Sequence, residues 1–412
     1  MNKHEKENIY YIDSLEAYDL ALQFYRPNKD LLITDNTFIS NSSKIQNDIV
    51  DISELLSQEK GNKIGEVTLS LCNDVENIFI KKNYNNIFYY LSSKLGLYLA
   101  ISSMLNTTIE KSLIISLFLK KYSIKKIYFF INKSSYYDEV NPWLFSRFSN
   151  IYKFLAQKAF FGNIPYEIKE LDINNPNNIN DTRERNIFFR TFTWPLSYIF
   201  YRFFSFFRFF IKIKKNIYYI NTCETLHETL ARFYFRGYRI LSLKLPKTDE
   251  KIIENDEEKR ILLSSDIDPI LQKYLSDIFS SQSEINSQKE IIIDHILLGL
   301  LKLGNDTKIY TKYFSELGPI KNILTAGFYG PIANQIFYLC KKHQIKLIGF
   351  EHGVTAGINK ATSTYINQLE STTCNFLMVS NVAAKKEFDK GNLSNDISKC
   401  NKVYVIGEAE QK

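Results

Sequence analysis

Residues 321–357, KNILTAGFYGPIANQIFYLCKKHQIKLIGFEHGVTAG, decide the fold that this sequence predicts. The apolar run Ile323–Ala326 is followed by two glycines, which is typical of a buried strand that ends in a tight turn. Pro331 suits the first turn of a helix, because the nitrogen of proline has no hydrogen to leave unpaired there. Apolar residues then recur at helical spacing, and a second apolar run covers 345–350. The segment therefore predicts a strand, a helix and a second strand.

Glu351, His352 and Gly353 come directly after the second of these strands. Open α/β sheets bind ligands at the carboxyl ends of their strands, so we predict that His352 takes part in chemistry. A neutral imidazole can accept a proton from a hydroxyl, and a charged one can hold a phosphate oxygen. Glu351 would set the tautomer of His352 or point away into the sheet. Gly353 and Gly357 would leave room for a ligand at the backbone. The competing interpretation is a histidine satisfied within a glycine turn.

The turn from Gly327 to Gly330 precedes the expected helix, and a helix N-terminus is a natural anion site. We therefore predict that both glycines contact the phosphates of a ligand. The pattern is not a dinucleotide fingerprint, because it lacks the complete GxGxxG spacing. A strand-to-helix turn that binds nothing explains it as well. Further back, Glu224 and His227 are three residues apart without an HExxH motif, so capping or surface pairing is expected there.

Composition narrows the class of protein. A chain of 412 residues favours two domains, and the apolar fraction of 45% is that of a globular protein. The net charge of +7 permits an anionic membrane surface or a phosphorylated ligand, and it does not require nucleic acid. The five cysteines are dispersed, which predicts a reducing compartment and no metal site. The first residues lack the apolar stretch of a signal peptide, so we expect a cytoplasmic location.

Periodicity along the chain predicts an α/β fold of Rossmann-like parallel sheets flanked by helices. The first unit, 1–180, opens with strand, helix and strand, and a polar linker follows at 172–181. The second unit, 216–412, contains a helical insertion at 250–304. Other expectations in the first unit are a strand at 67–71, separate helices at 91–105 and 109–122, and a helix at 143–160.

The aromatic segment 187–213, IFFRTFTWPLSYIFYRFFSFFRFFIKI, is long enough to span a bilayer, but three arginines interrupt it. A basic helix with aromatic residues on its apolar face suits the membrane surface instead, so 181–215 forms a basic aromatic helix in this interpretation. Basic neighbours up to Lys215 would add attraction to anionic lipid. A core helix between domains, with its arginines directed outward, remains the alternative.

From 321 to 407 the chain resembles bacterial surface-polysaccharide transferases of the two-Rossmann glycosyltransferase architecture (GT-B). The resemblance rests on the glycine turn after a strand, the His-Gly pair in Phe350-Glu351-His352-Gly353, and the later strand ending in Val405-Ile406-Gly407. Capsule and teichoic-acid polymer transferases carry related His-Gly turns. The resemblance implies a nucleotide-sugar donor used as substrate without a cofactor, a glycan acceptor, and work by His352 on the acceptor or the donor phosphate.

In such enzymes the strand similar to 403–407 leads into a second Rossmann domain. We expect either that the sequence is a fragment without its donor domain or that the first unit supplies the other half. The leading function is transfer of a nucleotide-activated sugar or a polyol phosphate in surface-polysaccharide biosynthesis, peripheral to the inner face of the cytoplasmic membrane. The alternative is a non-catalytic membrane-associated module of a polysaccharide assembly or export complex.

Overall fold

The chain divides into two compact units, and each is assembled from separate segments. The first unit comprises Met1–Asn83, Ala100–Pro176 and Asp249–Lys302, and the second comprises Tyr84–Leu99, Asn177–Thr248 and Leu303–Lys412. The computed structural model describes residues 4–35, 37–41, 49–88, 94–132, 151–158, 160–171, 215–221, 223–246, 256–326, 331–351, 373–390 and 402–406.

The first unit contains a parallel sheet of five strands in the order β3-β2-β1-β4-β5. Its strands are β1 (His4–Ile12), β2 (Leu31–Thr34), β3 (Ile49–Asp51), β4 (Tyr122–Asn132) and β5 (Tyr166–Leu171). The chain order reverses between β1 and β4, which are neighbours in register from His4↔Tyr122 to Ile12↔Phe130. This strand order is the one found in Rossmann-like sheets.

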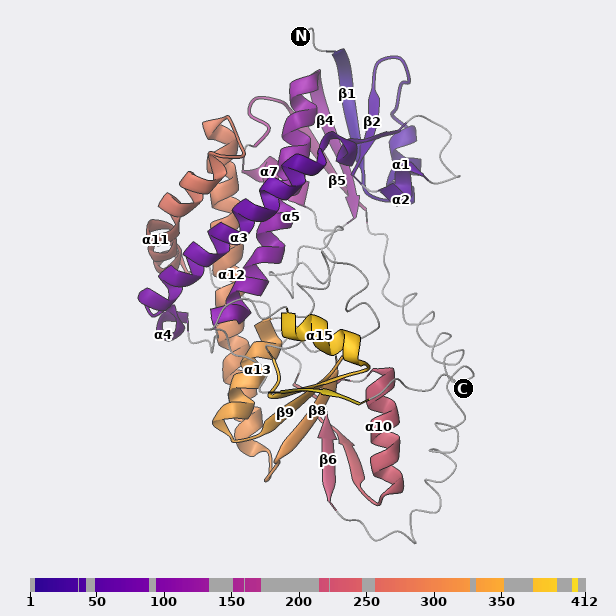
Figure 1. The fold of residues 1–412 in the computed structure, drawn as a ribbon. Helices are drawn as coiled ribbons and strands as arrows, with labels where there is room; N and C mark the ends of the chain where they lie inside the picture. Colours follow the sequence, from indigo (N-terminus) through magenta and orange to yellow (C-terminus); the bar gives the residue numbers. More distant parts are fainter. Residues whose placement is uncertain are drawn as a thin grey trace. The chain divides into compact units, whose positions relative to one another are not determined.

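Helices cover both faces of this sheet (Figure 1). They are α1 (Leu15–Leu22), α2 (Thr37–Ser40), η1 (Ile52–Leu55), α3 (Gln58–Lys81), α5 (Lys94–Lys121), α7 (Ile151–Gln157), α11 (Glu257–Leu275) and the first part of α12 (Gln282–Glu316). On one face, Tyr10, Ile12 and Phe130 form a buried cluster with Ala17 and Tyr18 of α1. Alternation along β1 and β4 turns Tyr11 and Phe129 to the opposite face, where Tyr152 of α7 contacts both rings.

The second unit contains a parallel sheet of six strands in the order β11-β10-β9-β8-β6-β7. Its strands are β6 (Asn216–Tyr219), β7 (Arg239–Ser242), β8 (Asn322–Ala326), β9 (Lys346–Phe350), β10 (Phe376–Val379) and β11 (Lys402–Val405). Its helices are α4 (Tyr84–Phe88), α10 (Glu224–Phe235), the end of α12, α13 (Pro331–Lys342) and α15 (Val382–Lys390). The chain order reverses between β6 and β8, which pair through Tyr218↔Ile323 and Tyr219↔Leu324.

Two buried clusters hold this second sheet between layers of helix. On one face, Leu324 and Phe350 pack with Leu226 and Leu230 of α10. On the other, Ile323 and Leu347 pack with residues of α13 and of the end of α12. The side chains of β8 therefore alternate between the two layers, as a strand buried on both faces requires.

The predicted α/β class with two Rossmann-like parallel sheets is confirmed, and so is the opening strand, helix and strand, because β1 pairs with β2 in parallel. The strand expected at 67–71 is wrong, since these residues lie within α3. The buried side chains of Ile64, Val67, Leu71 and Val75 recur at helical spacing, and this longer period prevails over a short β-branched run.

The break expected between 105 and 109 is also wrong, because α5 runs through it. Asn106, Thr107 and Thr108 are poor helix formers, yet each costs only a few tenths of a kcal/mol. Leu105 and Ile109 on either side are fully buried, and that packing holds the helix together.

The helical segment predicted at 250–304 lies, in the order of the chain, between strands β7 and β8 of the second sheet. In the fold, however, Asp249–Lys302 belongs to the first unit. There Tyr274 on α11 donates a hydrogen bond to Asp74 on α3 at 2.8 Å. The expected linker 172–181, the aromatic segment 187–213 and the first half of the expected helix 143–160 lie outside the described residues. Among the helices that the structure does describe, none is both long and apolar enough to cross a membrane.

Candidate functional site

The reversal of strand order between β6 and β8 marks the place in the second sheet where a ligand is expected. Parallel sheets bind ligands outside the carboxyl ends of their strands at such a reversal. In this sheet α10 begins just after β6, α13 begins after β8, and α15 begins after β10. All three helices therefore direct their N-terminal N–H groups towards this edge, which we call the carboxyl edge of the second sheet.

Cys223 caps α10 at this edge. Its Sγ accepts a hydrogen bond from the backbone N–H of Leu226 at 3.4 Å and donates to the carbonyl oxygen of Glu351 at 3.5 Å. The capping expected around Glu224 and His227 thus comes from the cysteine. His227 is half-buried, and burial lowers its pKa, so it is neutral around pH 7.

Glu351 is buried and joins the carboxyl ends of two neighbouring strands. Its Oε2 accepts hydrogen bonds from both the backbone N–H and the hydroxyl of Ser380, each at 2.9 Å. Its own N–H donates to the carbonyl of Met378 at 2.9 Å. The carboxylate therefore points towards β10 and fixes the backbone from which His352 follows.

The remaining predicted site residues fall in parts of the chain that are not described. They are His352, Gly327, Gly330, Gly353 and Gly357. Of the predicted site, the structure thus places Glu351, and the two strand ends from which these residues continue.

The N-terminus of α13 differs from those of its two neighbours. Cys223 caps α10, and the Asn381 side chain caps α15 by accepting from the N–H of Ala384 at 2.8 Å. The residue before α13 is Gly330, which has no side chain to offer, and the first turn of α13 contains no acidic residue. The positive end of this helix dipole is therefore the one best suited to an anion.

Thr325 shares a face of β8 with Ile323, which packs against α13 and the end of α12. It is 2% exposed, and its Oγ1 is buried without a hydrogen-bond partner among the described residues. Ile323, two residues earlier on the same face, packs with Ile336 of α13. Since α13 runs back along β8, Thr325 sits nearer to the first turn of the helix. A buried hydroxyl without a partner at this position is unusual, because such groups are normally satisfied.

At the corresponding carboxyl edge of the first sheet, one buried carboxylate is held by side chains of the same unit. Asp35, directly after β2, accepts hydrogen bonds from Tyr11 at 2.7 Å and Tyr152 at 2.9 Å. The ammonium of Lys111 lies 3.2 Å from the same carboxylate. Burial, followed by the charge of Asp35, raises the pKa of both tyrosines well above the usual value, so both remain donors. The Asp35 carboxylate therefore has three partners within the protein.

Metal ligands do not gather in the described part of either unit: no group of three or more His, Cys, Asp or Glu side chains there could hold an ion. Comparisons of the chain with family models, with curated proteins and with solved structures returned no match. What the fold defines is therefore the class: an α/β protein with two Rossmann-like parallel sheets.

The sequence predicts a site at the carboxyl edge but does not indicate the other residues that the structure places there. Within the sequence Thr325 belongs to an apolar run, and its position next to a strand end is the one signal it offers. Cys223 and Ser380 gave no signal, because their roles depend on contacts with Glu351, which is 128 residues away from Cys223 in the chain.

Proposed function

We propose that this protein is a transferase that moves a nucleotide-activated sugar, or a polyol phosphate, onto a surface glycan, and that the second unit binds the phosphates of the donor. The single observation that carries the proposal is that α13 starts directly after a glycine, while the buried hydroxyl of Thr325 on the preceding strand has no partner among the described residues. A phosphate oxygen would accept from N–H groups in the first turn of α13 and from that hydroxyl.

Two further features support this assignment. The subsite lies on β8, one of the two strands between which the strand order reverses, where α/β sheets bind nucleotides. The sheet also presents Glu351 in a fixed position directly before His352. In the proposed reaction His352 accepts the proton of the acceptor hydroxyl, and helix N-termini stabilise the leaving nucleotide.

A thermal-shift screen of the complete chain against CMP, CDP, UDP and GDP and their sugars tests the proposal. A ligand that binds the folded state raises its apparent stability by mass action. We expect at least one diphosphate to raise the melting temperature. Thr325→Val, which removes the hydroxyl and keeps the shape, should weaken that binding by about tenfold, the size of one hydrogen bond to a charged group.

Thr68→Val is the matched control. Thr68 on α3 of the first unit is also a buried threonine whose Oγ1 lacks a partner among the described residues, and it should leave nucleotide binding unchanged. If no nucleotide raises the melting temperature, the transferase proposal fails and the alternative of a non-catalytic membrane-associated module gains support. If Thr325→Val binds as tightly as the wild-type protein, the phosphate does not lie at α13.

A further inference from the structure

Positively charged residues gather at the amino edge of the second sheet, at the opposite end of its strands from the candidate site. Lys215 precedes β6, Arg239 begins β7, Lys321 precedes β8 and Lys346 begins β9. Backbone hydrogen bonds bring these residues together in pairs. The N–H of Arg239 donates to the carbonyl oxygen of Lys215 at 3.0 Å, and the N–H of Lys346 donates to that of Lys321 at 2.9 Å. Four neighbouring strands therefore each start with a cation.

Helix ends add to this charge. Arg236 is the C-cap of α10, Lys341 and Lys342 end α13, and Lys312 lies near the end of α12. Cations at a helix C-terminus offset the helix dipole, which accounts for Arg236, Lys341 and Lys342. That account does not extend to the cations at the strand starts. All eight are exposed, and we call them the basic edge: Lys215, Arg236, Arg239, Lys312, Lys321, Lys341, Lys342 and Lys346.

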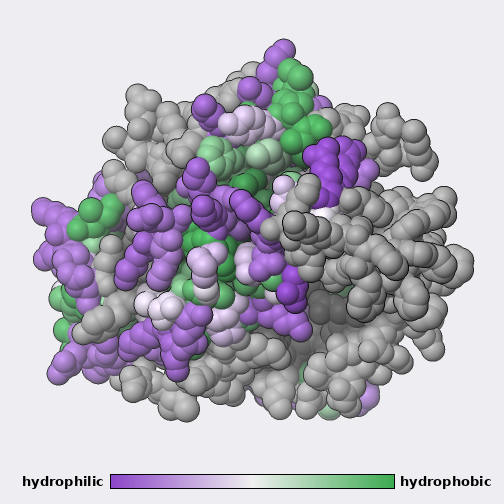
Figure 2. Space-filling view, turned by 90° about the horizontal axis from the view of Figure 1, so that it is seen from below, coloured by the Kyte–Doolittle hydropathy of each residue, from purple (hydrophilic) through white to green (hydrophobic). Residues whose placement is uncertain are grey.

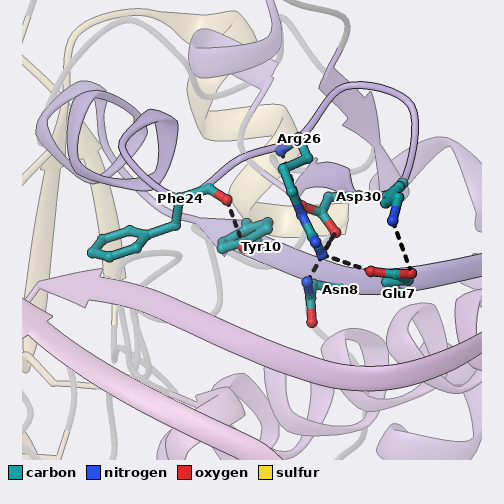
Figure 3. A network of polar contacts seen from close by, with 7 residues as sticks. Glu7, Asn8, Tyr10, Phe24, Arg26 and Asp30 are labelled. Atoms are coloured by element: carbon teal, nitrogen blue, oxygen red, sulfur yellow. Dashed lines mark hydrogen bonds and ion pairs between the residues drawn. The ribbon is translucent and has the colours of Figure 1, made fainter.

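The described part of the protein does not neutralise the charges of this edge. Within the described residues none of the eight cations forms an ion pair, and Glu316 is the one exposed acid at the ends of the same elements. The first sheet treats its amino side differently (Figure 3). There Arg26 pairs with Glu7 at 2.8 Å and with Asp30 at 3.1 Å, and Lys29 lies 3.6 Å from Glu7.

The shape and chemistry of the edge indicate what it contacts. β6 begins at the bottom of Figure 1, and Figure 2 views the molecule from that side, where hydrophilic residues, in purple, make up much of the described surface. Six of the eight cations are lysines, which act as flexible point charges. Nucleic-acid surfaces instead combine arginine forks with aromatic residues that stack on bases. An array of exposed lysines suits a diffuse anionic surface.

We propose that the basic edge docks the second unit on an anionic lipid bilayer. Every Lys or Arg held within a Debye length of the headgroups adds to the attraction. This contact is separate from the aromatic segment 187–213 and does not depend on the proposed donor binding. It would leave the carboxyl edge, at the other end of the same strands, open to a donor that arrives from solution.

Vesicle flotation of the complete chain tests the proposal. Vesicles of phosphatidylcholine alone and of phosphatidylcholine mixed with phosphatidylglycerol are compared at low and high salt. We expect the wild-type protein to float with the mixed vesicles and to be released by salt. The variant K321E/K341E/K342E/K346E should lose more than about tenfold in its partition coefficient, since four attractive charges become repulsive.

The matched control is K60E/K63E/K81E/K125E, which makes the same change in net charge at exposed lysines of the first unit and should still float. Equal flotation of the basic-edge variant and the wild-type protein would refute the proposal, as would an equal loss in both variants. Preference of the wild-type protein for duplex DNA over the mixed vesicles at the same salt would refute it too. If the glutamate variant does not fold, the corresponding glutamine variant is judged by the same criteria.

Discussion

The two sheets share a parallel architecture, but polar side chains at their edges differ in whether they have partners within the protein. At the carboxyl edge of the first sheet, Asp35 is saturated by Tyr11, Tyr152 and Lys111. At the same edge of the second, the hydroxyl of Thr325 has no partner among the described residues. The amino edges repeat the contrast, with ion pairs in the first sheet and the basic edge in the second. Asp35 and Glu7 are thus occupied within the protein, whereas Thr325 and the basic edge keep polar groups available to a ligand.

The largest effect is expected from His352→Ala. If the second unit carries the chemistry, this change should lower turnover by about two to four orders of magnitude, the usual range for general acid–base catalysis. The measurement is the initial rate at saturating donor, using the nucleotide sugar found by thermal shift. His343→Ala, an exposed histidine just after α13, is the control and should keep its turnover. Equal turnover in both variants would exclude His352 as the base.

The next effect concerns stability in the first unit. Asp30 is fully buried and accepts from the N–H of Arg26 and from the amide of Asn8, both at 2.9 Å. Asp30→Ala should cost about 2–4 kcal/mol, because the backbone N–H and the guanidinium of Arg26 and the amide of Asn8 all lose their acceptor. Hydrogen exchange of the amides in β1 and β2 measures it. Lys346→Ala on the basic edge should stay within about 0.5 kcal/mol, and a comparable cost there would remove the contrast between the sheets.

Acid should weaken the first unit through His295. Burial is the main cause that lowers its pKa to about 4 in the folded protein from an ordinary value of 6.5. The unfolded chain therefore binds the proton first. The contribution of neutral His295 to the free energy of unfolding is complete above pH 6.5. It falls as the pH drops towards 4, by up to about 3 kcal/mol. Urea unfolding between pH 7 and 4 should show this slope, and His295→Leu should flatten it. If the pH dependence of the free energy of unfolding is unchanged in His295→Leu, another group causes the acid sensitivity.

The smallest effect compares two hydroxyl groups. Tyr152→Phe removes one donor from the buried Asp35 and should cost about 1–2 kcal/mol, since Tyr11 and Lys111 still serve the carboxylate. Thr325→Val should change stability by less than about 0.5 kcal/mol, because its hydroxyl has no hydrogen bond to lose among the described residues. Urea unfolding compares them. A cost at Thr325 as large as at Tyr152 would mean that this hydroxyl is already bonded within the protein.

Local patterns predicted much of the fold and little of the site. Helix α13 begins at Pro331 and strand β9 ends at Phe350, as the proline and the apolar run 345–350 predict. The strand order was out of reach, because it depends on which strands meet across long insertions. The same limit applies to Asp35, whose partner Tyr152 is 117 residues away. Periodicity shows which face of a helix or strand is buried. A site depends instead on which residues, far apart in the chain, come into contact.

The interleaving of the two units has a consequence for synthesis on the ribosome. The strands of the first sheet are complete by Leu171, but α11 and α12 follow only after β6, α10 and β7. Those late helices carry Tyr274, the partner of Asp74, and Gln288, which donates to Ser112 at 2.6 Å. The nascent first unit therefore stays unfinished, with apolar surface exposed, until part of the second has emerged. Cutting the chain between the two sheets would produce an N-terminal piece without the helices that complete its layer over α3 and α5.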